Sequence, residues 1–130
     1  MDAIKKYYAV VAEKVLGNFE KRGIEGHYFD SSSAMLDFVK KMVPENSIVS
    51  WGGSMSLKES GVPEYFYSGK FNVIDREAAD TPEKLTKAYR DALSADYYFM
   101  GSNAVTMDGK LLNIDGTGNR VAALCYGPTH

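Results

Sequence analysis

Two glycine-rich segments carry the residues whose types and spacing could do chemistry. Residues 50–54 read Ser-Trp-Gly-Gly-Ser, and residues 115–120 read Asp-Gly-Thr-Gly-Asn-Arg. Each segment follows a short apolar run and precedes a predicted helix. Glycines let the backbone approach a ligand closely, and the unpaired N–H groups at a helix start attract anions. The two segments therefore predict a site for a small anionic metabolite, either a carboxylate or a phosphorylated compound.

Arg120 is the cation expected to hold this anion, because a guanidinium can clamp a carboxylate or phosphate through two hydrogen bonds. The alternative is a structural turn in which Asp115 caps the helix and Arg120 lies in solvent. Ligand binding is favoured, because anion-binding helix starts reuse this design. The residues expected to contact the ligand are Ser50, Gly52, Gly53, Ser54, Asp75, Arg76, Asn103, Asp115, Gly116, Gly118, Asn119 and Arg120.

Glu59 is the only candidate for a catalytic acid, base or nucleophile. It could act from the wall of the pocket. It also stands three residues after Ser56, and this spacing is that of a capping box, in which the serine caps a helix and the glutamate reaches back to it. On the sequence alone, both roles remain open.

Other site types fit the sequence poorly. Gly116 and Gly118 resemble the start of a dinucleotide fingerprint, but Val121 stands where the third glycine belongs. The two histidines show no ligand spacing with cysteines or carboxylates, so neither a metal site nor a cofactor is expected. Cys125 lies among apolar residues and is expected to be a buried thiol.

Composition limits the class of protein. A chain of 130 residues with 45% apolar content fits one domain with a substantial core. A net charge of -2 argues against a nucleic-acid partner. No apolar run approaches the roughly 18–20 residues that span a bilayer, and the one cysteine offers no internal disulfide. These features predict a cytoplasmic protein with no membrane partner.

The order of elements predicts an α/β fold. Apolar spacing predicts helices over residues 4–21, from about 31 to 43, and over 56–60, 82–93 and 120–126. Strands are expected over residues 27–29, 47–51, 72–75, 96–100, 104–107 and 110–114. The last two would form a β-hairpin with a two-residue turn at Asp108-Gly109. Such alternation favours a mostly parallel sheet with helices on both faces, which places ligands at the carboxyl ends of the strands.

Three stretches resemble a known family. Residues 50–61 resemble the "WGGS…E.G" loop of the LUD (lactate-utilisation) domain family, and residues 73–76 match it as well. Residues 113–123 are similar to its "NIDG.GNRVAA" signature. The resemblance implies a fold like that of glucosamine-phosphate isomerases, ribose-phosphate isomerases and CoA transferases (NagB/RpiA/CoA-transferase-like). It also implies a link to the oxidation of L-lactate to pyruvate.

Three functions remain open under this resemblance. The first is a LUD-type domain that binds a small anionic metabolite. The second is a non-catalytic accessory subunit of a redox complex with iron–sulfur and oxidoreductase subunits. The third is an isomerase- or CoA-transferase-like enzyme, which would need Glu59 in the pocket.

The C-terminal end departs from the family pattern. Similar proteins continue past Gly127-Pro128 with another strand and helices, some with a cysteine cluster, whereas this chain stops at His130. We therefore expect a domain over residues 1–130 that is incomplete at its C-terminus and cannot carry its own cluster. An open sheet edge there would favour a homodimer.

Overall fold

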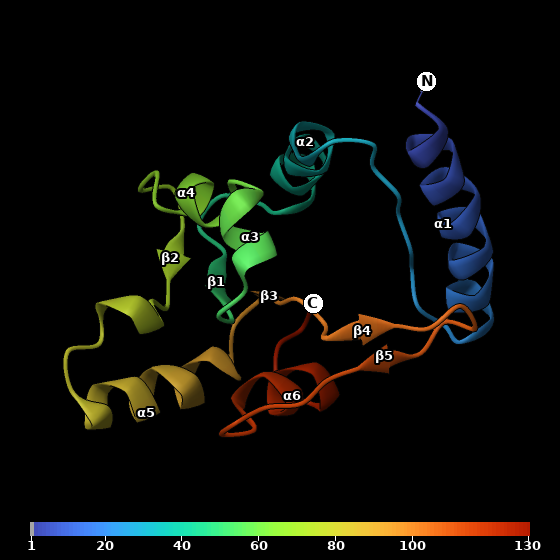
Figure 1. Ribbon diagram of the computed structural model, residues 1–130. Helices are drawn as coiled ribbons and strands as arrows, with labels where there is room; N and C mark the ends of the chain where they lie inside the picture. The colour runs from blue at the N-terminus through green and yellow to red at the C-terminus, as the bar shows by residue number, and fades with distance from the viewer. Residues whose placement is uncertain (1) are drawn as a thin grey trace.

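A computed structural model describes residues 2–130 and has a three-stranded parallel sheet at its centre. The strand order is β2 (Asn72–Val73), β1 (Ile48–Trp51), β3 (Tyr97–Phe99). Val49 of β1 lies opposite Val73 and Tyr97. The predicted α/β fold with a parallel sheet is confirmed (Figure 1).

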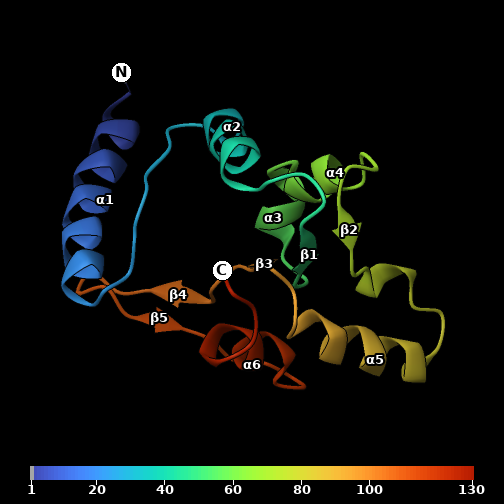
Figure 2. The same ribbon diagram turned by 180° about the vertical axis from the view of Figure 1, so that it is seen from behind.

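Helices cover both faces of the sheet. On one side lie α2 (Ser32–Met42), α3 (Met55–Glu59) and α4 (Val62–Phe66), and on the other α5 (Pro82–Ala92) and α6 (Asn119–Cys125) (Figures 1 and 2). Burial on two sides explains why successive residues of β1 are inaccessible: Val49 is 0% exposed, Ser50 2% and Trp51 4%. A parallel strand between two helical layers has this continuous burial.

The two faces differ in the size of their side chains. On the side of α2 and α4, Phe66 of α4 is fully buried. Its ring centroid lies 4.9 Å from that of Phe71 and 5.1 Å from that of Phe99. Against α5, β1 presents Ser50, whose hydroxyl donates to the Ile74 carbonyl at 2.8 Å. The aromatic face supplies most of the core, and the smaller face leaves room for polar side chains.

A β-hairpin extends from the sheet region and contacts the first helix. Ala104 of β4 (Ala104–Val105) pairs antiparallel with Leu112 of β5 (Leu111–Leu112). The hairpin is confirmed, but the two-residue turn is wrong. The Gly109 N–H donates to the Thr106 carbonyl and the Thr106 N–H to the Lys110 carbonyl, which leaves a three-residue loop. Gly109 has φ +83°, the left-handed position that such loops assign to glycine.

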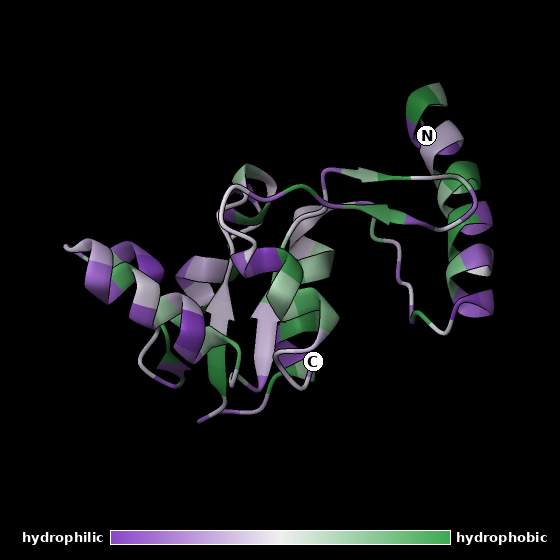
Figure 3. Ribbon diagram, turned by 90° about the horizontal axis from the view of Figure 1, so that it is seen from below, coloured by the Kyte–Doolittle hydropathy of each residue, from purple (hydrophilic) through white to green (hydrophobic). Residues whose placement is uncertain are grey.

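Helix α1 (Ala3–Lys21) packs on this hairpin rather than on the sheet. The Asn18 side chain donates to the Met107 carbonyl at 2.8 Å, and Arg22 donates to the Asp108 carbonyl at 2.9 Å. No residue of α1 is buried. Figure 3 shows the hairpin extending from the sheet region to α1, which stands apart as an arm.

Two local predictions were wrong. Residues 27–29 form no strand, because His27 and Phe29 pack their rings against Phe38 of α2, at 4.5 and 5.3 Å between centroids. Cys125 is exposed rather than buried. In the short helix α6 it is Ala123 that turns toward the core.

Other elements match their predicted bounds within about two residues. Helix α4 and a 3₁₀ turn, η1 (Arg76–Ala78), were not predicted. Gly61, which has φ +80°, is the N-cap residue before α4, and Pro63 lies in the first turn of the helix. No helix among residues 2–130 has the length and apolar content needed to cross a membrane.

The backbone of His130 lies along the free edge of β3. Its N–H donates to the Asp96 carbonyl, and its carbonyl accepts from the Tyr98 N–H, both at 3.0 Å. These are the hydrogen bonds of a parallel strand pairing. They occur where the family resemblance implies that a further strand begins.

Candidate functional site

A guanidinium–carboxylate pair holds together the loops beyond the sheet. Arg120 donates through Nε to Asp115 Oδ1 at 2.8 Å and through Nη1 to the Gly101 carbonyl at 2.6 Å. Its Nη2 donates to Asn103 Oδ1 at 2.6 Å and to the Ile114 carbonyl at 3.1 Å. All three nitrogens are engaged, and the side chain is only 16% exposed. Arg120 therefore ties the segment after β3 to the segment after β5.

Both carboxylate oxygens of Asp115 also accept hydrogen bonds. Its second oxygen accepts from the Val121 N–H at 2.6 Å, which fixes the start of α6. Burial opposes ionisation, but the Val121 N–H and the Arg120 guanidinium outweigh it and hold the pKa of Asp115 below its usual range. The carboxylate is therefore charged at neutral pH and serves as the counter-ion of Arg120.

A second arginine, Arg76, lies close by without such partners. Asp75 caps η1 by accepting from the Glu77 N–H at 2.9 Å, and it also accepts from the Tyr67 hydroxyl at 2.8 Å. This cap places Arg76 at the first position of the turn. The Arg76 guanidinium lies 5.4 Å from the centre of the Tyr89 ring. Among the ion pairs of residues 2–130, none involves Arg76.

The two arginines line one polar cavity of about 270 Å³. Small-molecule pockets commonly span roughly 300–1,000 Å³, so this cavity suits a small ligand. Its lining residues come from the β1–α3 loop, η1 and the segments after β3 and β5: Gly53, Arg76, Asn103, Ile114, Asp115, Gly116, Asn119 and Arg120.

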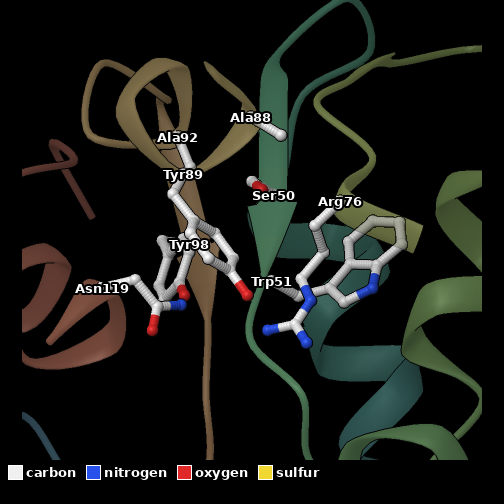
Figure 4. Close-up of a pocket in the computed structure, with 8 residues that line it drawn as sticks. All are labelled: Ser50, Trp51, Arg76, Ala88, Tyr89, Ala92, Tyr98 and Asn119. Carbon is white, nitrogen blue, oxygen red and sulfur yellow. The ribbon is translucent and has the colours of Figure 1, made fainter. Parts of the chain in front are cut away.

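A narrow cavity of about 10 Å³ adjoins the polar cavity through Arg76 and Asn119, which line both. Figure 4 shows the polar ends of Tyr89, Tyr98, Asn119 and Arg76 all lying toward the carboxyl end of β1. Burial is the main reason that the pKa of Tyr98 is raised. The charge of Asp115 adds to this effect, while Arg76 and Arg120 oppose it. The Tyr98 hydroxyl therefore stays protonated at neutral pH and can donate a hydrogen bond.

The paired glycines make this approach of side chains feasible. A Cβ on Gly52 would lie 3.2 Å from the Tyr98 hydroxyl oxygen, and one on Gly53 would lie 3.1 Å from an Arg76 Nη. Neither glycine has a positive φ. Close approach rather than turn geometry therefore explains the Gly52-Gly53 pair.

The structure brings most of the predicted ligand-binding residues together. Seven line the polar cavity: Gly53, Arg76, Asn103, Asp115, Gly116, Asn119 and Arg120. Ser50 lines the adjoining narrow cavity, and Gly52 lies against Tyr98. The remaining three have positions outside the polar cavity. Ser54 caps α3, Asp75 caps η1, and Gly118 caps α6 with φ +79°.

The structure does not bring Glu59 to this cavity. Glu59 is exposed at the last position of α3 and lines none of the cavities described here. Nor does it form the capping box, because the helix starts two residues earlier than the box requires. Ser54 rather than Ser56 caps α3, by accepting from the Leu57 N–H at 3.3 Å.

Tyr98 and Tyr89 are site residues that the sequence analysis missed. The signal for Tyr98 was available, because alternate residues of a strand share a face. Ser50 and Tyr98 are directly paired in the register of β1 and β3 and point to the side of α5. Within residues 2–130, no three histidine, cysteine or acidic side chains gather closely enough to hold a metal ion.

The fold and the cavity define an α/β domain with a polar pocket at the carboxyl ends of parallel strands. The family model of the LUD domain matches residues 12–130. The chain therefore belongs to the LUD domain family, which is associated with lactate-utilisation proteins. No curated protein and no solved structure matches the chain.

Proposed function

We propose that this domain binds a small anionic metabolite in the polar cavity, with Arg76 as the principal cation. The observation that carries the proposal is the contrast between the two arginines. Arg120 has all its nitrogens committed to Asp115, Asn103 and two carbonyls. Arg76 lines the same cavity without an acidic partner among the described residues. A carboxylate or phosphate would supply that partner.

Neutral donors would orient the ligand beside Arg76. Asn119 Oδ1 accepts from the Thr117 hydroxyl at 2.8 Å, which leaves its amide nitrogen available as a donor. The protonated Tyr98 hydroxyl is a second donor. A 2-hydroxy or 2-oxo acid such as lactate or pyruvate matches this set, with its carboxylate on Arg76 and its oxygen substituent toward the neutral donors. The family's association with lactate utilisation supports this ligand class.

Thermal unfolding with pyruvate, L-lactate and inorganic phosphate tests the proposal. A ligand at about 100 times its dissociation constant adds about 2.7 kcal/mol to the free energy of unfolding. Arg76→Gln should reduce this shift by half or more, because a hydrogen bond to a charged group contributes about 1.5–3 kcal/mol. Lys14→Gln, on the exposed arm α1, is the matched charge-removing control. An equal shift in the Arg76 variant would contradict the proposal.

A second candidate function is that of an accessory subunit in a redox complex. The observation in its favour is the arm α1, where Ile4, Tyr7, Tyr8 and Val10 are more than half exposed and no residue is buried. Exposed apolar patches of this kind mark protein contacts. Such a patch would suit iron–sulfur or oxidoreductase subunits or a homodimer. Co-purification from the source cell separates these cases, and recovery only as a free homo-oligomer would argue against the accessory role.

The isomerase- or CoA-transferase-like alternative depends on Glu59. Since Glu59 is exposed and lines no described cavity, we assign it no catalytic role. The proposal is therefore one of binding rather than of catalysis by Glu59. We also propose that residues 1–130 act as a single domain and that the protein works in the cytoplasm. Replacing Glu59 by Gln should leave ligand binding unaltered in the same unfolding assay.

A further inference from the structure

A second, larger cavity lies between α5 and α6. It has a volume of about 410 Å³. Its walls include the apolar side chains of Leu85, Leu93 and Ala122 and the ring of Tyr89. Two threonines, Thr86 and Thr117, add hydroxyls. This α5–α6 groove plays no part in holding the fold's main aromatic core, which lies on the opposite face of the sheet.

The groove adjoins the anion site. Asn119 lines both the groove and the polar cavity, and Tyr89 lines both the groove and the narrow cavity beside Arg76. The Arg76 guanidinium lies over the Tyr89 ring at 5.4 Å. A molecule held by its acidic group at Arg76 can therefore extend past Tyr89 and Asn119 into an apolar space.

We infer that the ligand is an acid with an apolar body, namely a carboxylic or phosphoric acid that carries an alkyl or aryl substituent. This inference rests on the proposed function and deepens it. A three-carbon acid would occupy only the polar cavity and leave the apolar groove to water. Burying apolar surface raises affinity by about fourfold for each methylene. The longer acid is therefore the better partner for this pair of cavities.

The size and lining of the groove argue for a small molecule. Its volume of about 410 Å³ falls within the roughly 300–1,000 Å³ that small-molecule pockets commonly span. Such pockets are lined mostly by apolar and aromatic side chains, with a few polar groups that orient the ligand. The groove has this composition, with Thr86, Arg90 and Asn119 among its polar residues. An alkyl or aryl group is therefore the occupant that the groove suits.

Dissociation constants for two matched series test the inference, with each series measured by titration calorimetry on the whole chain. The carboxylate series is pyruvate, 2-oxobutyrate, 2-oxohexanoate and phenylpyruvate, and the phosphate series is inorganic phosphate, butyl phosphate and phenyl phosphate. In one series, affinity should rise by at least tenfold from the smallest member to the largest. Which series shows the rise identifies the acidic group. A flat series in both arms would overturn the inference.

Two variants on α6 locate the effect. Ala122 is exposed and lines the groove, so Ala122→Phe fills the groove without disturbing the core. It should bring phenylpyruvate, or phenyl phosphate, down to the affinity of the smallest member of its series. Cys125→Phe adds the same bulk on the same helix away from the groove and should keep the tenfold preference. Thr86→Phe, from the opposite wall, should repeat the Ala122→Phe result.

The same measurements separate failure of the inference from failure of the proposed function. Arg76→Gln should weaken every member of the binding series by a similar factor. If it weakens them and size has no effect, only the apolar extension is wrong. If it has no effect, the anion site itself is wrong. If Ala122→Phe changes the sedimentation mass of the free protein while the size preference persists, the groove is a contact between copies and the inference is overturned.

Discussion

Arg120 Nε and Asp115 Oδ1 lie 2.8 Å apart, and this pair closes the loop between β5 and α6. Both side chains are largely buried, with 16% and 9% exposed. The partners of each residue lie on different segments, so the pair connects the end of β3, the end of β5 and the start of α6. The loop that looks most like a ligand clamp in the sequence is therefore held in shape by its own charges.

Replacing Arg120 by Ala should destabilise the fold. Removing one partner of a buried ion pair costs about 3–5 kcal/mol, because the other charge remains buried without compensation. Lys84→Ala removes half of an exposed pair with Asp80 and should cost less than about 1 kcal/mol. Urea denaturation of the two variants beside the wild type measures the difference. Equal losses in both variants would show that the Arg120 network contributes no more than a surface pair.

Asp115 predicts a dependence of stability on pH. Its folded-state pKa is depressed, despite the opposing effect of burial, by the Val121 N–H and Arg120. A group with a depressed pKa contributes stability that is present above its unfolded value, about 3.9, and is lost as pH falls through the folded value. The free energy of unfolding should therefore drop below about pH 4.

Asp115→Asn isolates this contribution from other acids, including Asp108, whose pKa is also lowered, chiefly by the Thr106 hydroxyl. The difference in unfolding free energy between wild type and Asp115→Asn should be largest near neutral pH and should shrink below about pH 4. Denaturation curves at several pH values give this difference directly. A difference that stayed constant across the acid range would mean that Asp115 does not titrate with folding.

Local structure followed from the sequence wherever neighbouring residues decide it. The buried run of β1, the proline at the start of α5 and the hairpin around Asp108-Gly109 were predicted, although the turn has three residues rather than two. Each rests on backbone preferences within a few residues. Residues 27–29 have the composition of a strand, but the structure pairs their rings with Phe38 of α2 instead. That outcome depends on a tertiary contact, which the local pattern does not contain.

The roles of the two arginines illustrate the limit for the site. The sequence placed both in the ligand-binding set, because both follow predicted strands, Arg120 in a glycine-rich segment and Arg76 directly after the strand end. Which guanidinium is free depends on distant acceptors: Arg120 reaches the Gly101 carbonyl, 19 positions away, and Asn103, 17 positions away. Which donor pairs with which distant acceptor is decided by the folded geometry. Tyr98 was not predicted for another reason: it belongs to a core strand, in which Tyr97 and Phe99 pack on the aromatic side while Tyr98 faces the narrow cavity.

The glycines of the site should respond differently to an added methyl group. A Cβ on Gly52 would meet the Tyr98 hydroxyl at 3.2 Å and the Arg120 Cδ at 3.7 Å. Overpacking of this kind costs about 1–3 kcal/mol, so Gly52→Ala should lower the midpoint of thermal unfolding. Gly116 has open space around it and no positive φ. Gly116→Ala should leave the midpoint unchanged or raise it slightly, because alanine reduces the freedom of the unfolded chain.

The comparison of the two alanine variants also tests the packing of the loop. If Gly116→Ala destabilised the protein as much as Gly52→Ala, the segment 115–120 would be closely packed rather than open. The control is Gly17→Ala in α1, where the added Cβ also meets nothing within 4 Å. Alanine favours a helix interior over glycine by roughly 0.5–1 kcal/mol, so this variant should be stabilised.

Tyr98→Phe should weaken ligand binding without harming the fold. The substitution removes one hydroxyl that, among residues 2–130, neither donates nor accepts a side-chain hydrogen bond, and it keeps the ring that lines the narrow cavity. Its hydrogen bond to a bound 2-oxo acid would contribute about 0.5–1.5 kcal/mol, so the dissociation constant for pyruvate should rise by about two- to tenfold. Titration calorimetry gives this value, and thermal unfolding without ligand checks the fold.

The control is Tyr97→Phe, at the neighbouring residue on the opposite face of the strand. This variant should bind as the wild type does. If both variants bound pyruvate equally well, the hydroxyl of Tyr98 would point at the site without contacting the ligand, and the orienting role would fall to Asn119 alone.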